Sequence, residues 1–281
     1  MAVPEMIKYR REFVAAFNVG VSLLKNRGLE ESMSMGRSAV FDVTAVGGRM
    51  SKRSIDGRIP RTNVADTQVT VTLEEYVKKF EVTNFEKFTS QSDERAKMNH
   101  RIMESVNQEL DYVILNELAN ASNVYNSGTA VTMSQAVATK IIAQLARSSV
   151  PINPGDLTWV ITPDMHAKLL NMAGYTSADY VNSKPLAGNT GQYDGTAKIR
   201  SWLDIGWVVH PNLPGAGTAT ASSYLFHRRA LGVAAPDEQI KYSAGYDDQD
   251  HFHYASATVK AGAKLLQQAG VLKVVHDDTA A

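Results

Sequence analysis

A run of thirty residues without glycine or proline, 92–121, constrains the fold of this chain more than any other feature. Apolar residues recur in it at every fourth position, at Met98, Ile102, Val106, Leu110, Ile114 and Leu118. This spacing predicts one buried face of an amphipathic helix, which Met103 and Val113 are expected to widen. Ser90 and Asp93 match a capping box just upstream. At 1.5 Å per residue the helix is about 45 Å long, well above three to four turns, and indicates a spine for other elements.

The segment before this helix, residues 36–75, is predicted to form an extended β-hairpin. Apolar residues alternate with polar or small ones at Phe41, Val43 and Ala45 and again at Val69, Val71 and Leu73, which is the period of a strand. Between these runs lies a polar stretch, from Arg49 to Arg61, with five cations and one acid, Asp56. The five cations define the hairpin tip: Arg49, Lys52, Arg53, Arg58 and Arg61. A two-stranded hairpin alone is marginally stable in water, so we expect it to lie on something else.

The rest of the chain is predicted to mix helices with strands. Residues 157–161 form a strand, followed by Thr162 as N-cap, Pro163 at the first helical position, and a helix to Met172 that ends at Gly174. Another helix, capped by Thr132 or Ser134, has its apolar face at Val137, Ile141, Ile142 and Leu145. Further strands are expected at 76–82, 198–203, 207–210, 223–227, 239–243, 251–260 and 271–275, and a long polar loop at 174–196. This order indicates interleaved α+β domains.

Composition excludes several kinds of site. The chain has 281 residues, no cysteine and a formal net charge of zero. Without cysteine there are no disulfides, thiolate zinc sites or cysteine nucleophiles, and a neutral chain has no overall attraction for nucleic acid. No apolar window of membrane-spanning length and no signal-peptide core are found, so we expect a soluble protein made in the cytoplasm.

One pair of histidines provides the best metal candidate. His251 and His253 fall on one face of the strand predicted at 251–260, just after Asp247, Asp248 and Asp250. No third ligand of defined spacing accompanies them, so we favour an exposed acidic turn that leads into a strand. The glycine-rich stretches at 188–191 and 215–217 lack the residues of a phosphate loop, and no acid–base set is recognisable. We assign no catalytic, cofactor or metal residues.

The basic hairpin tip has two interpretations. It can contact nucleic acid, but no aromatic residue lies between its charges to provide a stacking platform. Acidic groups on a neighbouring copy of the chain are equally good partners electrostatically. Because the hairpin must dock somewhere, we favour the contact between subunits.

In this order, the parts resemble the major capsid proteins of tailed bacteriophages, which have the Hong Kong 97-like fold. TWVITPDMHAKLLNMAG at 158–174 is similar to the strand-Pro-Asp-helix step of that family, and IGWVVHPNLPG at 205–215 is similar to its turn ending in Asn-Leu-Pro. The resemblance implies an α+β fold of four parts. They are an N-terminal arm (1–35), an E-loop hairpin (36–75), a peripheral domain with the spine helix (76–131 and 235–281) and an axial domain (132–234).

The resemblance also implies a function. A major capsid protein is a structural protein without enzymatic activity or cofactors, which assembles with itself into the pentamers and hexamers of an icosahedral shell. The shell encloses double-stranded DNA with weak, non-specific contact. The short arm leaves no fused scaffold, so a separate scaffolding protein and a portal are implied as partners, with no membrane. The location is the virion, and the host cytoplasm during assembly.

Two alternatives stay open at this point. An encapsulin-type nanocompartment shell protein shares the fold but encloses enzymes. A soluble α+β metal-dependent hydrolase would use His251 and His253. The contents of a purified particle separate the first alternative from a capsid, and a metal assay tests the second.

Overall fold

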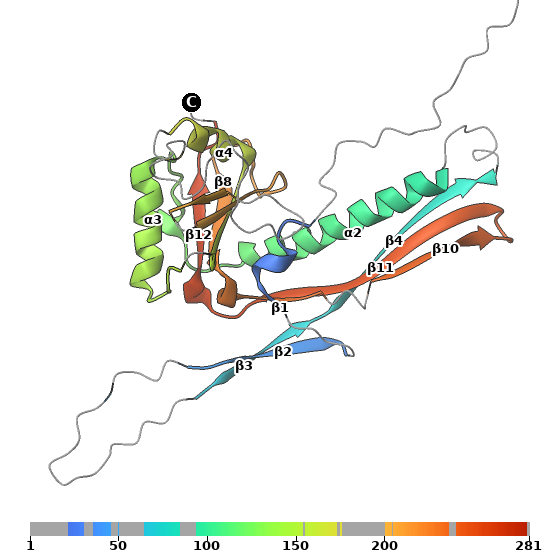
Figure 1. Cartoon of the computed structure of the whole chain (residues 1–281), viewed down its shortest axis with the longest axis horizontal. Helices are drawn as coiled ribbons and strands as arrows, with labels where there is room; N and C mark the ends of the chain where they lie inside the picture. The colour runs from blue at the N-terminus through green and yellow to red at the C-terminus, as the bar shows by residue number, and fades with distance from the viewer. Residues whose placement is uncertain are drawn as a thin grey trace, which may run out of the picture.

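The computed structural model has an α+β architecture with few helices and several sheets, as predicted (Figure 1). It describes residues 22–30, 36–45, 50, 65–84, 94–153, 155–172, 175, 200–203, 205–235 and 240–279. In Figure 1 an elongated part, where a long helix lies along a sheet, adjoins a compact part with shorter helices. No helix within these ranges is long and apolar enough to cross a membrane.

The long helix is α2, which spans Glu94–Ala119. Its 26 residues correspond to about 39 Å at 1.5 Å per residue. The prediction of a buried face is confirmed, since six residues of the stripe are buried: Met98, Ile102, Val106, Leu110, Ile114 and Leu118. Met103 is 56% exposed, so the expectation that it widens this face was wrong. Ser90 and Asp93, the proposed capping box, lie outside the described residues.

The two halves of the α2 face pack on different parts of the fold. The N-terminal half packs on strand β11 (Phe252–Leu265), against a row of small residues: Ala255, Ala257, Val259 and Ala261. Such small side chains allow the helix to lie close to the sheet. The C-terminal half, around Ile114, packs on the compact part of the chain, against Val160, Tyr224 and Phe226. One helix therefore belongs to two hydrophobic cores.

Strand β11 is the centre of the elongated sheet. It pairs antiparallel with β10 (Lys241–Asp247) and with β4 (Glu74–Thr83). Farther along, it pairs antiparallel with β9 (Leu231–Ala234), which pairs in parallel with β1 (Leu29–Glu30). The strands predicted at 76–82, 239–243 and 251–260 are therefore present and longer than predicted, although β10 and β11 begin two residues and one residue later. The hairpin is present as β2 (Ser38–Val43) and β3 (Thr67–Thr72), paired from Ser38↔Thr72 to Val43↔Thr67.

A second five-stranded sheet forms the compact part. Its order is β12 (Val271–His276), β8 (Ala221–His227), β5 (Leu157–Ile161), β7 (Ile205–Val209) and β6 (Arg200–Trp202). β5 and β7 are parallel and the other neighbours are antiparallel. Helices α3 (Gln135–Arg147) and α4 (Pro163–Leu170) contribute to the core on one face, and the C-terminal half of α2 contributes to the core on the other. Short 3-10 turns lie at Lys25–Arg27, Tyr125–Gly128, Arg228–Ala230 and Gln268–Gly270.

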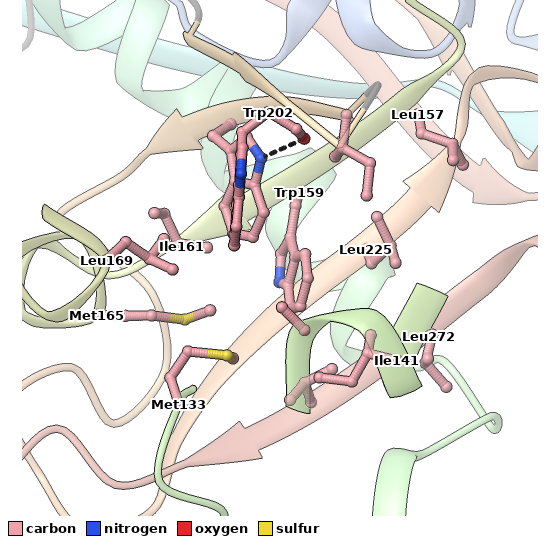
Figure 2. Packing of buried hydrophobic residues seen from close by; sticks show 14 of the residues in the cluster. Met133, Ile141, Leu157, Trp159, Ile161, Met165, Leu169, Trp202, Leu225 and Leu272 are labelled. Atoms are coloured by element: carbon pink, nitrogen blue, oxygen red, sulfur yellow. Dashed lines mark hydrogen bonds between the residues drawn. The ribbon is translucent and has the colours of Figure 1, made fainter. Parts of the chain in front are cut away.

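Tryptophans fill the core between this sheet and the two helices (Figure 2). The rings of Trp159 and Trp207 stack with centroids 4.5 Å apart. Trp207 Nε1 donates to the Trp202 carbonyl oxygen at 3.0 Å, and Trp159 Nε1 donates to Ser223 Oγ at 3.3 Å. Both indole N–H groups are thus satisfied, as buried polar groups need to be.

The helix starts in the compact part follow the sequence signals. Ser134, not Thr132, caps α3 by accepting from the Val137 N–H at 3.3 Å. Thr162 caps α4 as predicted. α4 ends at Leu170, two residues before the predicted Met172, because the following N–H groups bond carbonyls three residues back. Gly174 and nearly all of the loop predicted at 174–196 lie outside the described residues.

Replacing Ile114 with aspartate is expected to unfold the chain. Ile114 is 1% exposed, and burying an unpaired carboxylate costs several kcal/mol, comparable with a domain's whole stability of about 5–15 kcal/mol. Met103→Asp, on the exposed side of the same helix, is the matched control and is expected to melt like the wild type. Circular dichroism melting checks both. A cooperative, wild-type-like melt of Ile114→Asp would show that this face of α2 is not buried.

Candidate assembly surfaces

The base of the hairpin is held on the elongated sheet by a small apolar cluster. Phe41, Val71 and Ala39 are buried together with Ala234 of β9. The Phe41 ring lies so close to Gly232 that a Cβ there would be 3.0 Å from it, and a Cβ on Gly262 would clash with the Thr72 carbonyl oxygen. Gly232 and Gly262, which we call the glycine seat, therefore leave the space in which the base of the hairpin packs on the sheet. The alternation predicted for the strands is confirmed here, with Val40 exposed between two buried neighbours.

The five hairpin-tip residues lie outside the described residues: Arg49, Lys52, Arg53, Arg58 and Arg61. Met50, described between them, is fully exposed. In Figure 1 the ends of β2 and β3 that lead to the tip point to the left, away from α2 and β4. The described strands of the hairpin therefore lead away from the elongated part of their own chain.

A hollow runs between α2 and β4, and we name it the α2–β4 groove. One section, of about 440 Å³, is lined by Glu75, Tyr76 and Lys78 from the strand and by Ser105, Glu109 and Tyr112 from the helix. A second section, of about 270 Å³, continues past Tyr76 and has Glu74, Asn116 and Glu117 in its lining. The groove is therefore bounded by the strand on one side and by a polar flank of the helix on the other.

Negative charge predominates in the α2–β4 groove. Tyr76 donates its hydroxyl hydrogen to Glu74 Oε2 at 3.0 Å. Burial, this hydrogen bond, and the charges of Glu74 and Glu109 raise the pKa of Tyr76 to about 12, so its hydroxyl is a hydrogen-bond donor at neutral pH. Glu117 accepts from the Leu265 N–H at 3.0 Å. Four acids thus line the two sections, against the single lining cation Lys78 among the described residues.

Asp111 on α2 fixes the point where the N-terminal arm leaves the described fold. Its carboxylate accepts from Ser22 Oγ at 2.6 Å, from the Leu23 N–H at 3.0 Å and from the Leu24 N–H at 3.1 Å. His210 Nε2 lies 3.4 Å from the same carboxylate. The Asn212 N–H donates to His210 Nδ1, so Nε2 carries the hydrogen that faces Asp111. We call this set the Asp111 clasp.

The C-terminal strand is held by another buried polar cluster. Thr162 Oγ1 donates to Asp278 Oδ1 at 3.0 Å, and His276 Nε2 lies 3.0 Å from the same oxygen. The Gly217 N–H donates to the other carboxylate oxygen at 3.1 Å. Burial lowers the pKa of His276 below its ordinary value, against the opposing effect of the Asp278 charge. Thr162 thus caps α4 and also joins it to the end of the chain.

The comparisons with known proteins agree with this architecture. The sequence model of the phage capsid protein family matches residues 7–278, nearly the whole chain. The chain belongs to the phage capsid protein family. No curated protein matches the sequence.

Several solved structures with the same fold come from phages. A structure from Mycobacterium phage Che8 superposes with a TM-score of 0.74 at 16% identity, over 100% of both chains. The capsid of Ralstonia phage GP4 gives a TM-score of 0.70 at 13% identity, over 98% of this chain and 96% of the other. The head structure of Helicobacter pylori bacteriophage KHP40 gives 0.68 at 12% identity, over 96% and 94%. The fold of this capsid protein is therefore that of phage head shells.

The histidine pair of the capsid protein is not arranged as predicted. His251 lies in the turn before β11 with φ of 54°, so the strand begins only at Phe252. The two imidazoles therefore do not share a strand face. The two histidines contact Tyr246 in different ways. The Tyr246 hydroxyl lies 3.1 Å from His251 Nδ1, whereas the Tyr246 ring centroid lies 4.9 Å from the ring centroid of His253. Among the described residues no group of three or more His, Asp or Glu is arranged to hold a metal ion, and the hydrolase alternative receives no support.

Removing the carboxylate of Asp111 is expected to release the arm. Asp111→Ala leaves the N–H groups of Leu23 and Leu24 without their acceptor, which costs about 1–3 kcal/mol. Trypsin should then cut faster at Lys25 and Arg27. Asp248→Ala, at an exposed turn, is the control and should be cut at the wild-type rate. If Asp111→Ala is also cut at the wild-type rate, the clasp does not hold the arm.

Proposed function

We propose that this capsid protein assembles with itself into the pentamers and hexamers of a closed icosahedral shell that encloses double-stranded phage DNA. The single observation that carries the proposal is the position of the hairpin in a chain that belongs to the capsid family. Within the described residues, the hairpin packs on its own chain only at its base. A projecting hairpin of two strands needs a surface to cover it. In a shell, a neighbouring subunit supplies that surface.

The parts of the chain are assigned on the Hong Kong 97-like plan. Residues 1–35 are the N-terminal arm and 36–75 the E-loop, while 76–131 with 235–281 form the peripheral domain and 132–234 the axial domain. The packing of α2 on β4 and β11 supports the peripheral assignment, and the sheet around β5 supports the axial one. β12, at the end of the chain, crosses into the axial sheet by pairing with β8. The β12–β8 pairing therefore joins the proposed peripheral domain to the proposed axial domain.

Further partners follow from the same proposal. A separate scaffolding protein and a portal take part in assembly, which takes place in the host cytoplasm. The net charge of zero suits a wall that encloses DNA with weak, non-specific contact, because strong binding to DNA needs several cationic phosphate contacts. The role is structural and involves no enzymatic step.

Self-association is the first expected outcome. The purified protein should form capsomers or shells, with or without a candidate scaffolding protein, as measured by light scattering across a wide range of concentration and salt. Nuclease-protected DNA in particles isolated from infected cells would separate a phage head from an enzyme-filled compartment. Monomers under every one of these conditions would contradict the proposal.

The hairpin tip is proposed to contact a neighbouring subunit. Changing Arg49, Arg53, Arg58 and Arg61 together to glutamate should leave the monomer folded and impair assembly, because like charges then face the acids of the partner. The matched control changes the same four residues to lysine, which keeps the charge, and should assemble. Particle yield and circular dichroism measure the two effects. Normal yield from the glutamate variant, or an unfolded monomer, would contradict the contact.

A further inference from the structure

Another hollow lies between α2 and strand β10, on the opposite flank of the helix from the α2–β4 groove. It has a volume of about 380 Å³, and its lining includes Asn99, Ile102 and Met103 from the helix and Tyr242 and Ala244 from the strand. We name it the Tyr242 pocket. Every lining residue that the structure describes is uncharged, so the pocket suits an apolar segment and not a charged one.

Two large side chains of this pocket are exposed in the single chain. Met103 and Tyr242 are each 56% exposed. Tyr242 is paired with Ala257 of β11, and residues paired across an antiparallel ladder lie on the same face of the sheet. Because Ala257 is buried in the cluster with α2, the Tyr242 side chain is on the helix side. Large exposed apolar side chains around a hollow are typical of a binding surface.

The described end of the N-terminal arm lies on the same flank of α2. Asp111, which holds Ser22, belongs to a ridge of side chains spaced by four along the helix: Asn99, Met103, Asn107 and Asp111. Ser105 and Glu109 of the α2–β4 groove belong to the ridge on the other side of the buried face. At 1.5 Å per residue, Met103 is about 12 Å from Asp111 along the helix. The clasp therefore holds the arm about two turns from the pocket.

The chain approaches the clasp from the far end of the helix. In Figure 1 the short turn at Lys25–Arg27 lies beside the C-terminal half of α2, whereas β10 lies along the N-terminal half. The chain leads from this turn back to Ser22, which is held at Asp111. A segment that continues in this direction passes between the exposed side of α2 and β10.

The residues before Ser22 have the pattern to fill the pocket. Phe13, Val14, Phe17 and Val21 are spaced as on one face of an amphipathic helix, while Lys8 and Glu12 fall on the opposite face. In a helix that leads back from the clasp antiparallel to α2, Val14 is level with Met103, because each is eight positions from the contact between Ser22 and Asp111. The apolar face of the arm is thus in register with the pocket.

We propose that residues 7–21 of the arm pack as a helix against α2 and β10 of their own chain, with Phe13 and Val14 in the Tyr242 pocket. The clasp holds the segment beside the pocket, which gives it a high effective concentration there compared with any separate molecule. The contact lies within one chain and goes beyond the proposed assembly. It is therefore tested on the unassembled subunit, where failure to form shells has no influence on the result.

Proteolysis of the unassembled subunit tests the contact. Tyr242→Asp places a charge in the apolar pocket and should raise the rate of tryptic cutting at Arg10 and Arg11 by roughly tenfold, because cleavage follows the fraction of arms that are open. The matched control is Tyr112→Asp. Tyr112 is 54% exposed and lines the groove on the other flank of α2, so this variant should be cut at the wild-type rate. Circular dichroism melts of both should stay close to the wild type, because the arm lies outside the cores.

The reciprocal change in the arm provides a second readout. Phe13→Ser with Val14→Ser should raise the rate of cutting to the same extent as Tyr242→Asp. Combining all three changes should raise it no further, because both sets remove the same contact. Effects that multiply would show two separate contacts and would overturn the inference. Wild-type cutting of folded Tyr242→Asp, or equally fast cutting of Tyr112→Asp, would also overturn it.

The absence of cysteine allows a direct measurement of position. A chain with Ala15→Cys in the arm and Ala244→Cys in the pocket is treated with a bismaleimide reagent at low protein concentration. A cross-link within one chain is expected, detected by mass spectrometry of the monomer band. The control pairs Ala15→Cys with Ser105→Cys on the other flank of α2 and should give little. Cross-linked dimers in place of monomers would show that the pocket takes the arm of a second copy and would contradict the proposal, as would equal cross-linking of both pairs or none with Ala244→Cys.

Discussion

The burial of one apolar face of α2 is the interaction on which the rest of this structure depends. The N-terminal half of that face packs on the row of small residues of β11, and the C-terminal half, around Ile114, packs on the sheet that contains β5. Because α2 contributes to both cores, it joins the elongated sheet to the compact part.

The hairpin and residues 22–24, which follow the first part of the arm, contact the rest of the chain at defined points. The hairpin is seated on Gly232 and Gly262, where a larger residue would collide with Phe41 or Thr72. The arm is held by the Asp111 clasp.

Much of the fold could be predicted because its signals are local. The four-residue spacing of α2 and the Thr162-Pro163 helix start depend on neighbours a few positions away. The Asp111 clasp could not be predicted, since Ser22 and Asp111 are 89 positions apart and nothing local marks them as partners. The same holds for the glycine seat and for the α2–β4 groove, which only the tertiary arrangement creates. The prediction that His251 and His253 share one strand face was wrong, because the left-handed backbone of His251 extends the turn by one residue.

An electron cryo-microscopy reconstruction of particles assembled from the purified protein tests the central claim most directly. Closed shells are expected, in which α2 spans both parts of each subunit and every hairpin lies over an adjacent copy. A reconstruction in which the hairpins fold back on their own chain, or a preparation that yields only monomers beside its scaffolding protein, would contradict it.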